Sequence, residues 1–340
     1  MRSFASDNNS SVHPSVLQAL AEVNVDHAFG YGEDPWTEKA IEMVQGLFER
    51  ECRIYFVFNG TGSNTMALQA MTRPYHFIYT AETGHIAVDE CGAPAKATGC
   101  MVKQIKTSDG KLRVKDLEPL MVNFGVDHHS QPGAVYISQC SELGTIYTPD
   151  EVRELCDFSH RHGMKVHMDG ARISNAAVAL GCTLDELSGA AGVDSLTLGG
   201  TKNGLMGAEC VVVFEPTLWN EAHFARKQAC QLASKSRYLA AQYIAFLRNE
   251  LWKENATKAN ERARELVEGL KEFPEVHFTQ ECQANQLFFT LPPAVAKELE
   301  KHYHFYYWNE SIHEVRLVTS WDTTTDDVQQ LLAQLTAILH

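Results

Sequence analysis

Two polar residues in the middle of the chain, Asp169 and Lys202, have the types and positions for covalent cofactor chemistry. Asp169 ends the alternating run 165–169, which predicts a half-buried strand, and Lys202 follows the apolar run 196–198 and a Gly-Gly pair. Open α/β sheets place ligand chemistry at the carboxyl ends of strands. There a lysine can form a Schiff base with pyridoxal phosphate (PLP), and a carboxylate can keep the pyridine nitrogen protonated. From these segments alone, a surface ion pair or two unrelated charges fit equally well.

A third segment with chemical potential is the turn Gly60-Thr-Gly-Ser-Asn64, between the apolar run 54–58 and the helix-like run 65–71. The free amides of a helix start, together with the hydroxyls of Thr61 and Ser63, can bind a phosphate. The turn lacks the lysine of a Walker loop and the third glycine of a dinucleotide fingerprint. Taken alone, such a turn is more often only a turn.

Histidines supply the candidate proton-transfer groups, because imidazole changes its charge near neutral pH. His85 ends a strand-like run, although an isolated histidine is more often a structural hydrogen-bonding residue than a catalyst. His128 and His129 precede the predicted strand 134–138. Adjacent residues cannot share one face of a strand, so we expect at most one of these two to point into a site.

The order of the strands and helices that would position these residues predicts an α/β fold. Strands are predicted at 54–58, 77–79, 101–105, 134–138, 165–169, 196–198 and 209–214. Helical segments lie between most of them, including 114–124 and a helix that starts at Thr148 with a capping box. This alternation predicts a mainly parallel sheet with helices on both faces.

The composition of the chain changes after this region. Helix formers dominate from about 218 to 270, and strands near 276–278, 286–290 and 315–318 then alternate with helices 294–302 and 325–339. The 340 residues, of which 44% are hydrophobic, suffice for one large and one smaller domain. We predict a large domain over 1–250, including the N-terminal segment, and a small α+β domain over 251–340.

Charge and composition exclude several classes of function. The formal net charge of -14 makes nucleic acid and anionic membranes poor partners. The sequence holds no apolar run long enough to span a bilayer and no signal-peptide core, so we expect a cytoplasmic protein. Nine scattered cysteines without a Cys-x-x-Cys pair predict reduced thiols, and we expect no metal site.

With these segments in view, the chain resembles the L-threonine aldolases of the low-specificity and phenylserine type. These are fold-type-I PLP enzymes of the beta-eliminating lyase superfamily. The resemblance runs nearly end to end, and its most discriminating parts are His167-Met-Asp-Gly-Ala-Arg172 and Gly199-Gly-Thr-Lys202. The other matching motifs are Phe4-Ala-Ser-Asp7, Tyr31-Gly-Glu-Asp-Pro35, Asn59-Gly-Thr-Gly62, Thr83-Gly-His85, Glu142-Leu-Gly-Thr145 and Gln231-Leu-Ala-Ser-Lys235.

The resemblance implies an aspartate-aminotransferase-like fold and a role for each matching residue near the cofactor. Lys202 would form the Schiff base, Asp169 would pair with the pyridine nitrogen, and His85 would stack on the ring. Arg172 would contact the cofactor oxygen, and Gly60, Thr61 and Gly62 would bind the phosphate. Thr201 is a further implied cofactor contact. Lys235, or Arg237 in its place, would reach the phosphate of a neighbouring subunit.

The resemblance also implies which residues bind the amino-acid substrate. Ser6, Arg172 and Arg316 would hold the carboxylate, where a guanidinium fork suits two oxygens. Tyr31 would approach the cofactor across a dimer interface. His129 aligns with a second active-site histidine, and either it or His85 would be the base that takes the β-hydroxyl proton.

The implied activity is retro-aldol cleavage of L-threonine, L-allo-threonine or a relative such as phenylserine to glycine and an aldehyde. A homodimer or homotetramer with sites at the dimer interface is the implied assembly. A β-eliminating lyase or an aminotransferase is the alternative within PLP chemistry, and a non-catalytic PLP-fold binding protein is the alternative from another class. A nicotinamide oxidoreductase is disfavoured because no Gly-x-Gly-x-x-Gly follows the first strand.

Overall fold

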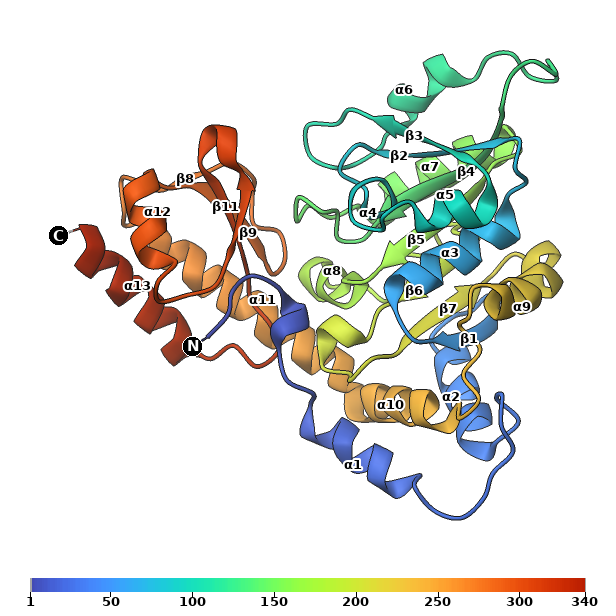
Figure 1. Cartoon of the computed structure of the whole chain (residues 1–340), viewed down its shortest axis with the longest axis horizontal. Coiled ribbons are helices and arrows are strands. Elements are labelled where there is room, and N and C mark those ends of the chain that lie inside the picture. Colours follow the sequence, from blue (N-terminus) through green and yellow to red (C-terminus); the bar gives the residue numbers. More distant parts are fainter. Residues whose placement is uncertain (1, 340) are drawn as a thin grey trace.

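The computed structural model describes residues 2–339, which fold around two β-sheets (Figure 1). In sheet order, the larger sheet contains β1 (Arg53–Val57), β7 (Glu209–Val213), β6 (Ser195–Leu198), β5 (Lys165–Gly170), β4 (Gln131–Ser138), β2 (His76–Ala81) and β3 (Met101–Ile105). Strand β7 pairs antiparallel with both its neighbours, and the remaining pairs are parallel. The prediction of a mainly parallel sheet is therefore confirmed.

Helices cover both faces of this sheet, as the alternating pattern predicted. Their bounds are α1 (Pro14–Glu22), α2 (Pro35–Gln45), α3 (Gly60–Met71), α4 (His85–Val88), α5 (Ala93–Thr98), α6 (Val114–Leu117), α7 (Pro149–Arg161), α8 (Ile173–Leu180), α9 (Trp219–Gln228) and α10 (Arg237–Leu247). Apolar side chains of α3 and α9 pack on one face, and those of α2, α7 and α10 pack on the other. The strands are therefore buried on both sides, which explains their continuous apolar runs.

Local sequence fixes where the helices begin and end. The capping box of α7 forms as predicted, with the Thr148 side chain accepting from the Glu151 amide and the Glu151 side chain accepting from the Thr148 amide. The helix predicted over 114–124 is wrong in length: α6 ends at Leu117, and a 3-10 turn covers Glu118–Leu120. Pro119 explains the early end, because it has no amide hydrogen to continue the α-helical ladder.

The smaller sheet is antiparallel, with the order β10 (Tyr306–Asn309), β11 (Glu314–Val318), β9 (Gln286–Thr290) and β8 (His277–Phe278). It packs with α11 (Leu251–Leu270), α12 (Pro293–Leu299) and α13 (Thr325–Leu339) around an apolar core of its own. Figure 1 shows α11 running from this sheet towards the helices of the larger one. The sequence analysis missed β10, a short and largely exposed edge strand without apolar alternation.

Residues 3–7, the N-terminal strap, connect the two sheets. The Phe4 amide donates to the His304 carbonyl (2.7 Å), and the Val318 amide donates to the Phe4 carbonyl (2.7 Å). The Phe4 ring is fully buried in the core of the small sheet. We propose that the small domain starts at α11, where the predicted boundary lies, and that the beginning of the strap packs with it rather than with the large domain.

Two properties of the whole chain bear on its environment. None of the helices within residues 2–339 is both long and apolar enough to cross a membrane. All nine cysteines are free thiols, as the sequence predicted, and most of them are buried.

The strap generates a stability prediction. Phe4→Ala removes a fully buried ring from the core of the small sheet, so we expect the free energy of unfolding to fall by about 3–5 kcal/mol. Urea denaturation monitored by circular dichroism measures it. The matched control is Phe224→Ala, whose ring is 59% exposed and which should change the same quantity by about 0.5 kcal/mol or less. Equal losses in both variants would contradict a core role for Phe4.

Candidate active site

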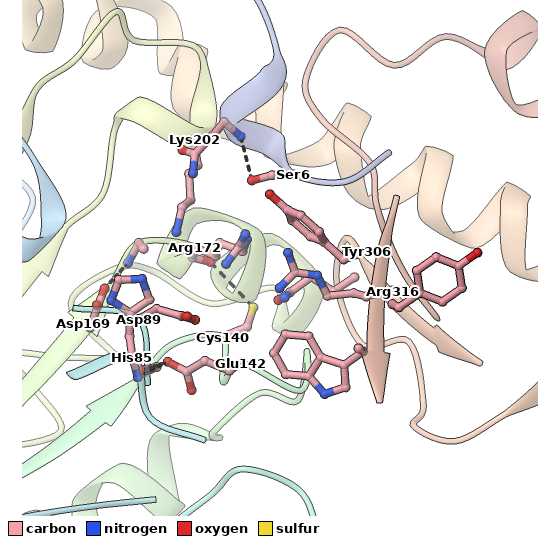
Figure 2. Close-up of a pocket in the computed structure, with 16 residues that line it drawn as sticks. Ser6, His85, Asp89, Cys140, Glu142, Asp169, Arg172, Lys202, Tyr306 and Arg316 are labelled. Atoms are coloured by element: carbon pink, nitrogen blue, oxygen red, sulfur yellow. Dashed lines mark hydrogen bonds between the residues drawn. The ribbon is translucent and has the colours of Figure 1, made fainter. Parts of the chain in front are cut away.

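A cavity of about 490 Å³ lies between the two sheets (Figure 2). Its walls come from the carboxyl ends of β4 and β5, the segment that follows β6, the N-terminal strap and the inner face of the small sheet. The predicted site residues that line it are Ser6, His85, Asp169, Arg172, Lys202 and Arg316. Residues separated by more than 300 positions in the sequence thus meet at one cavity, where the parallel strands end.

The Gly-Gly pair brings Lys202 to the end of β5. Strands β5 and β6 are parallel neighbours, with Asp169 opposite Thr197. A Cβ atom on Gly199 would lie 2.6 Å from the Ala171 backbone, and one on Gly200 would lie 2.3 Å from the Leu205 side chain. Only glycine fits this close approach, which turns the chain into the 3-10 helix Thr201–Asn203 and directs Lys202 into the cavity.

Asp169 is a buried carboxylate with a full set of donors. Its Oδ2 accepts from Asn64 Nδ2 (2.8 Å) and the Tyr136 hydroxyl (2.7 Å), and its Oδ1 accepts from the Ala171 amide (2.9 Å). Burial opposes the charge, but nearby His85 and Lys202, followed by these hydrogen bonds, outweigh it and lower the pKa of Asp169. Asp169 is therefore anionic at neutral pH, as a partner for a protonated ring nitrogen must be.

The Lys202 amine is set up to act as a nucleophile. It makes no hydrogen bond or ion pair with any side chain that the structure describes between residues 2 and 339. Burial, and then the positive charge of Arg172, lower its pKa, whereas Asp7 and Asp169 act in the opposite direction. A lowered pKa increases the fraction of neutral amine, which is the form that attacks a carbonyl.

His85 lies at the start of α4, between the buried carboxylate of Glu90 and the half-buried one of Glu142. Its Nδ1 is 2.7 Å from Glu90 Oε1, and its backbone amide donates to Glu142 Oε1 (2.8 Å). Burial disfavours the imidazolium, but the hydrogen bond with Glu90 and the charge of Asp169 outweigh it and raise the pKa of His85. The ligand atoms of His85, Glu90 and Asp169 lie within 4.8 Å of one another, so this group also has the spacing of a metal site. Sequence reasoning named neither Glu90 nor Glu142 as a site residue.

Arg172 forms a two-bond ion pair with Asp7 of the N-terminal strap. Its Nε donates to Asp7 Oδ2 (2.7 Å) and its Nη2 to Oδ1 (2.8 Å), while Asn285 Nδ2 also donates to Oδ2 (3.1 Å). Burial opposes ionisation of Asp7, but Arg172 outweighs it and keeps the pKa of this carboxyl low. Asp7 therefore fixes one edge of the guanidinium and leaves Nη1 free for a ligand. Asp7 lies in the motif Phe4-Ala-Ser-Asp7, but nothing in the local sequence indicates its pairing with Arg172.

Arg316 faces the cavity from β11 of the small sheet. Its guanidinium lies over the rings of Tyr306 and Trp308, at 5.2 and 5.0 Å from their centroids, and Nη2 donates to the Ala5 carbonyl (3.1 Å). Burial, and then the charge of Arg172, lower its pKa to about 10, so it remains a cation at neutral pH. In Figure 2, the side chains of Arg172 and Arg316 approach each other from the two walls of the cavity, so both can reach one ligand carboxylate.

The glycine turn forms the predicted helix start. Asn59 caps α3 by accepting from the Gly62 amide (2.8 Å), and Gln231 accepts from the Phe58 amide (2.9 Å). A Cβ atom on Gly62 would lie 2.2 Å from the Gln231 side chain, so only glycine fits there. The residues predicted to bind the phosphate, Gly60, Thr61 and Gly62, and also Thr201, are not in direct contact with the cavity that holds Lys202.

The structure does not bring His129 into the cavity of its own chain, and this corrects the prediction. His129 is exposed and precedes β4, whose opposite end, Ser138, lines the cavity. A strand of this length spans about 23 Å. Within one chain, therefore, His129 cannot take a proton from a ligand beside Lys202. His128 is exposed on the same loop.

Tyr31 and Lys235 also lie outside the cavity. Tyr31 is 57% exposed, and the Lys227 amine lies 5.5 Å from its ring centroid. Lys235 and Arg237 line a separate surface hollow next to Phe29. Contacts of Tyr31, Lys235 or His129 with a cofactor would therefore require a second subunit.

Comparisons with known proteins agree with this geometry. Residues 3–291 match the family model described as Beta-eliminating lyase. The chain is 38% identical over 340 residues to the low specificity L-threonine aldolase of Pseudomonas aeruginosa, covering 99% of this chain and 97% of that protein. It is 36% identical to the protein of the same name from a Pseudomonas species, with coverage of 99% and 97%.

Comparison with solved structures identifies the fold. A Leishmania major threonine aldolase superposes with a TM-score of 0.94 at 29% identity, covering 100% of both chains. A Sphingomonas wittichii serine palmitoyltransferase superposes with a TM-score of 0.75 at 14% identity, covering 98% of this chain and 86% of that one, which shows a shared fold alone. The predicted aspartate-aminotransferase-like, type I fold is thus confirmed.

The support beneath Asp169 generates a pH prediction. His167 is fully buried, its Nε2 lies 3.0 Å from Asn64 Oδ1, and burial lowers its pKa to about 4. In the unfolded chain, the His167 imidazole takes up a proton below about pH 6.5, whereas in the folded protein it stays neutral down to about pH 4. The folded protein therefore has its full stability above about pH 6.5 and loses stability as the pH falls towards 4. We expect this one group to account for about 3 kcal/mol of the loss.

Urea denaturation at a series of pH values between 7 and 4 tests this, with His167→Gln compared to wild type. The free energy of unfolding of the variant should depend less steeply on pH. His128→Gln, at an exposed position, should keep the wild-type dependence. Parallel curves for wild type and His167→Gln would show that His167 does not carry the effect.

Proposed function

The chain belongs to the beta-eliminating lyase family, and we propose that this lyase cleaves L-threonine, L-allo-threonine or a related β-hydroxy-α-amino acid such as phenylserine to glycine and an aldehyde. One observation carries the proposal: Lys202 and Asp169 come from neighbouring strand ends and line one cavity together with two arginines. The end-to-end similarity to proteins named low specificity L-threonine aldolase supports the choice among lyases.

Pyridoxal phosphate is the cofactor that these residues fit. Lys202 offers an unpartnered amine for its aldehyde, Asp169 an anionic oxygen for its ring nitrogen, and Gly60 and Thr61 helix-start amides for its phosphate. When bound, PLP would supply an electron sink for the pair left on Cα as the Cα–Cβ bond breaks. Thr201 and, from a second subunit, Lys235 or Arg237 are the further proposed contacts.

The two arginines determine how the amino acid is oriented. Arg172, fixed along one edge by Asp7, and Arg316, between two aromatic rings, bind the substrate carboxylate, with the Ser6 hydroxyl as a third donor. With the amino nitrogen on the cofactor and the carboxylate held by the two arginines, rotation about the N–Cα bond is restricted. The Cα–Cβ bond can then be held perpendicular to the ring plane, where it breaks most readily.

His85 is the proposed base for the β-hydroxyl proton. Its Nδ1 is engaged by Glu90, which leaves Nε2 to accept the proton and stabilises the imidazolium that forms. The raised pKa of His85 makes it a stronger base in the cavity than a free imidazole. Within one subunit His129 cannot share this role, so a contribution from His129 would have to come from a neighbouring chain.

We extend the proposal to assembly and location. Exposed apolar side chains next to the Lys235 hollow, with Phe29 the most exposed at 80%, favour a homodimer or homotetramer whose sites lie at the dimer interface. There Tyr31 could approach the cofactor of the second subunit. Nine free thiols favour a cytoplasmic location.

The first test of the activity follows the cofactor and the products. Wild type should gain a visible absorption band with PLP and release one glycine and one acetaldehyde per L-threonine consumed. Lys202→Ala should lose the band of covalently bound cofactor and lose more than about 10⁴-fold in kcat, since covalent catalysis goes with it. The control Lys253→Ala changes a lysine that is 54% exposed and should behave as wild type.

Other products would identify another reaction. Ammonia and a keto acid would indicate a β-eliminating lyase, and transfer of the amino group would indicate an aminotransferase. A band without any turnover would indicate a binding protein.

A second test concerns the base. His85→Gln should lower kcat by about 10²–10⁴ and flatten the acid limb of the pH–rate profile, because the group that takes the proton is gone. His129→Gln should lower kcat far less than His85→Gln, because His129 is exposed and lies at the opposite end of β4 from the cavity of its own chain. A loss in His129→Gln as large as in His85→Gln, with His128→Gln unaffected, would instead transfer the base role to the neighbouring chain.

A further inference from the structure

The wall that the small sheet presents to the cavity contains a polar side chain that the mechanism above does not use. Gln286 on β9 lines the cavity and is only 1% exposed. Neither its Oε1 nor its Nε2 has a hydrogen-bond partner within residues 2–339. Buried amides in native proteins are almost always paired, so an unpaired one at a ligand cavity indicates a group that the ligand itself supplies.

Strand register places Gln286 beside Arg316. Gln286 is opposite Val318 and Phe288 is opposite Arg316, so Gln286 and Arg316 are diagonal neighbours on the same face of the sheet. Side chains in this relation have Cβ atoms about 7–8 Å apart, within reach of one ligand for residues of this length. The Nε of Arg316 is a second buried donor that finds no acceptor in the described part of the chain. Two unpaired donor groups therefore face the same region.

The surroundings give Gln286 little choice of partner inside the protein. Gln286 packs closely on Gly144: a Cβ atom added to this glycine would lie 3.1 Å from the Cβ of Gln286. The ring of Phe288 packs against the same glycine. Phe288 in turn packs edge-on against Trp308, with centroids 5.3 Å apart. The residue is therefore held between a glycine turn and an aromatic wall at the border of the cavity, with both polar atoms of its amide buried.

We propose that Gln286 is a substrate-binding residue, whose Nε2 donates a hydrogen bond to the same carboxylate that Arg316 binds; this rests on the proposed function. Two unpaired donors on neighbouring strands suit an anion with two oxygens. The substrate carboxylate is the one anionic group common to all the amino acids considered above. The Nη2 of Arg316 already donates to the Ala5 carbonyl, so its Nε would donate to the ligand carboxylate.

This role has a kinetic signature. A carboxylate is bound in the ground state and in the transition state alike, so losing one of its donors weakens uniform binding. We expect Gln286→Leu to raise KM by about 10- to 100-fold, the range for a hydrogen bond to a charged group, and to leave kcat within about threefold. The increase should be similar for L-threonine and phenylserine, because the affected group is common to both.

The decisive experiment titrates PLP-loaded enzyme with glycine and with ethanolamine, and follows the visible band. Glycine has the carboxylate and ethanolamine lacks it, and neither has a β-substituent to cleave. Gln286→Leu should weaken glycine binding by the same factor as KM and leave ethanolamine binding unchanged. Gln286→Met, which keeps an unbranched chain, should behave in the same way. Gln330→Leu makes the same chemical change at an exposed position on α13 and should have no effect.

Folding is checked by circular dichroism and by the melting temperature of each variant. Glycine binding within twofold of wild type in both Gln286 variants would overturn the proposal. A KM increase for phenylserine alone would also overturn it, since Gln286 would then contact the side chain of the substrate. Failure of wild type to release glycine from L-threonine would disprove the proposed function instead, and glycine titration would still report on Gln286.

Discussion

A buried negative charge at the end of β5 is the constraint on which the rest of the site depends. Asp169 keeps its charge in a largely apolar sheet because His85 and Lys202 lie nearby and because three donors point at its two oxygens. These donors are Asn64, Tyr136 and the Ala171 amide. His167 forms a hydrogen bond with Asn64, and burial keeps the His167 imidazole neutral. Helix α3, two neighbouring strands and the turn after β5 are thus fixed relative to one another by one carboxylate.

The wall of the cavity opposite Asp169 is formed by the small sheet and the N-terminal strap, and it carries positive charge. The small sheet contributes aromatic rings and an arginine, and the N-terminal strap contributes a carboxylate that neutralises Arg172. The two arginines lie close enough for the charge of one to lower the pKa of the other. Asp7 relieves this repulsion, and a bound carboxylate would relieve it further. The site is therefore electrostatically prepared for an anion before one arrives.

The sequence was sufficient for elements with strong local signals. The strand before Asp169, the Gly-Gly pair before Lys202 and the capping box of α7 all depend on neighbouring residues, and all were predicted where they are found. Asn64, Asp7 and Glu90 were missed as site residues, because their roles depend on partners 105, 165 and 5 residues away that no periodicity reveals. For His129 the resemblance gave a role, but the direction of β4 places it at the far end of the sheet in its own chain, so that role requires a second subunit.

The way the strap docks has a consequence for how the chain acquires its shape during synthesis. Phe4 precedes every strand of both sheets, and it pairs with His304 and Val318, which lie 300 and 314 positions later. Until those partners have left the ribosome, Phe4 has no apolar environment and Asp7 has no fixed position, although the seven strands before residue 214 can already assemble. Closure of so long a loop is a late and slow step. The cavity is thus completed only when the strap meets the small sheet.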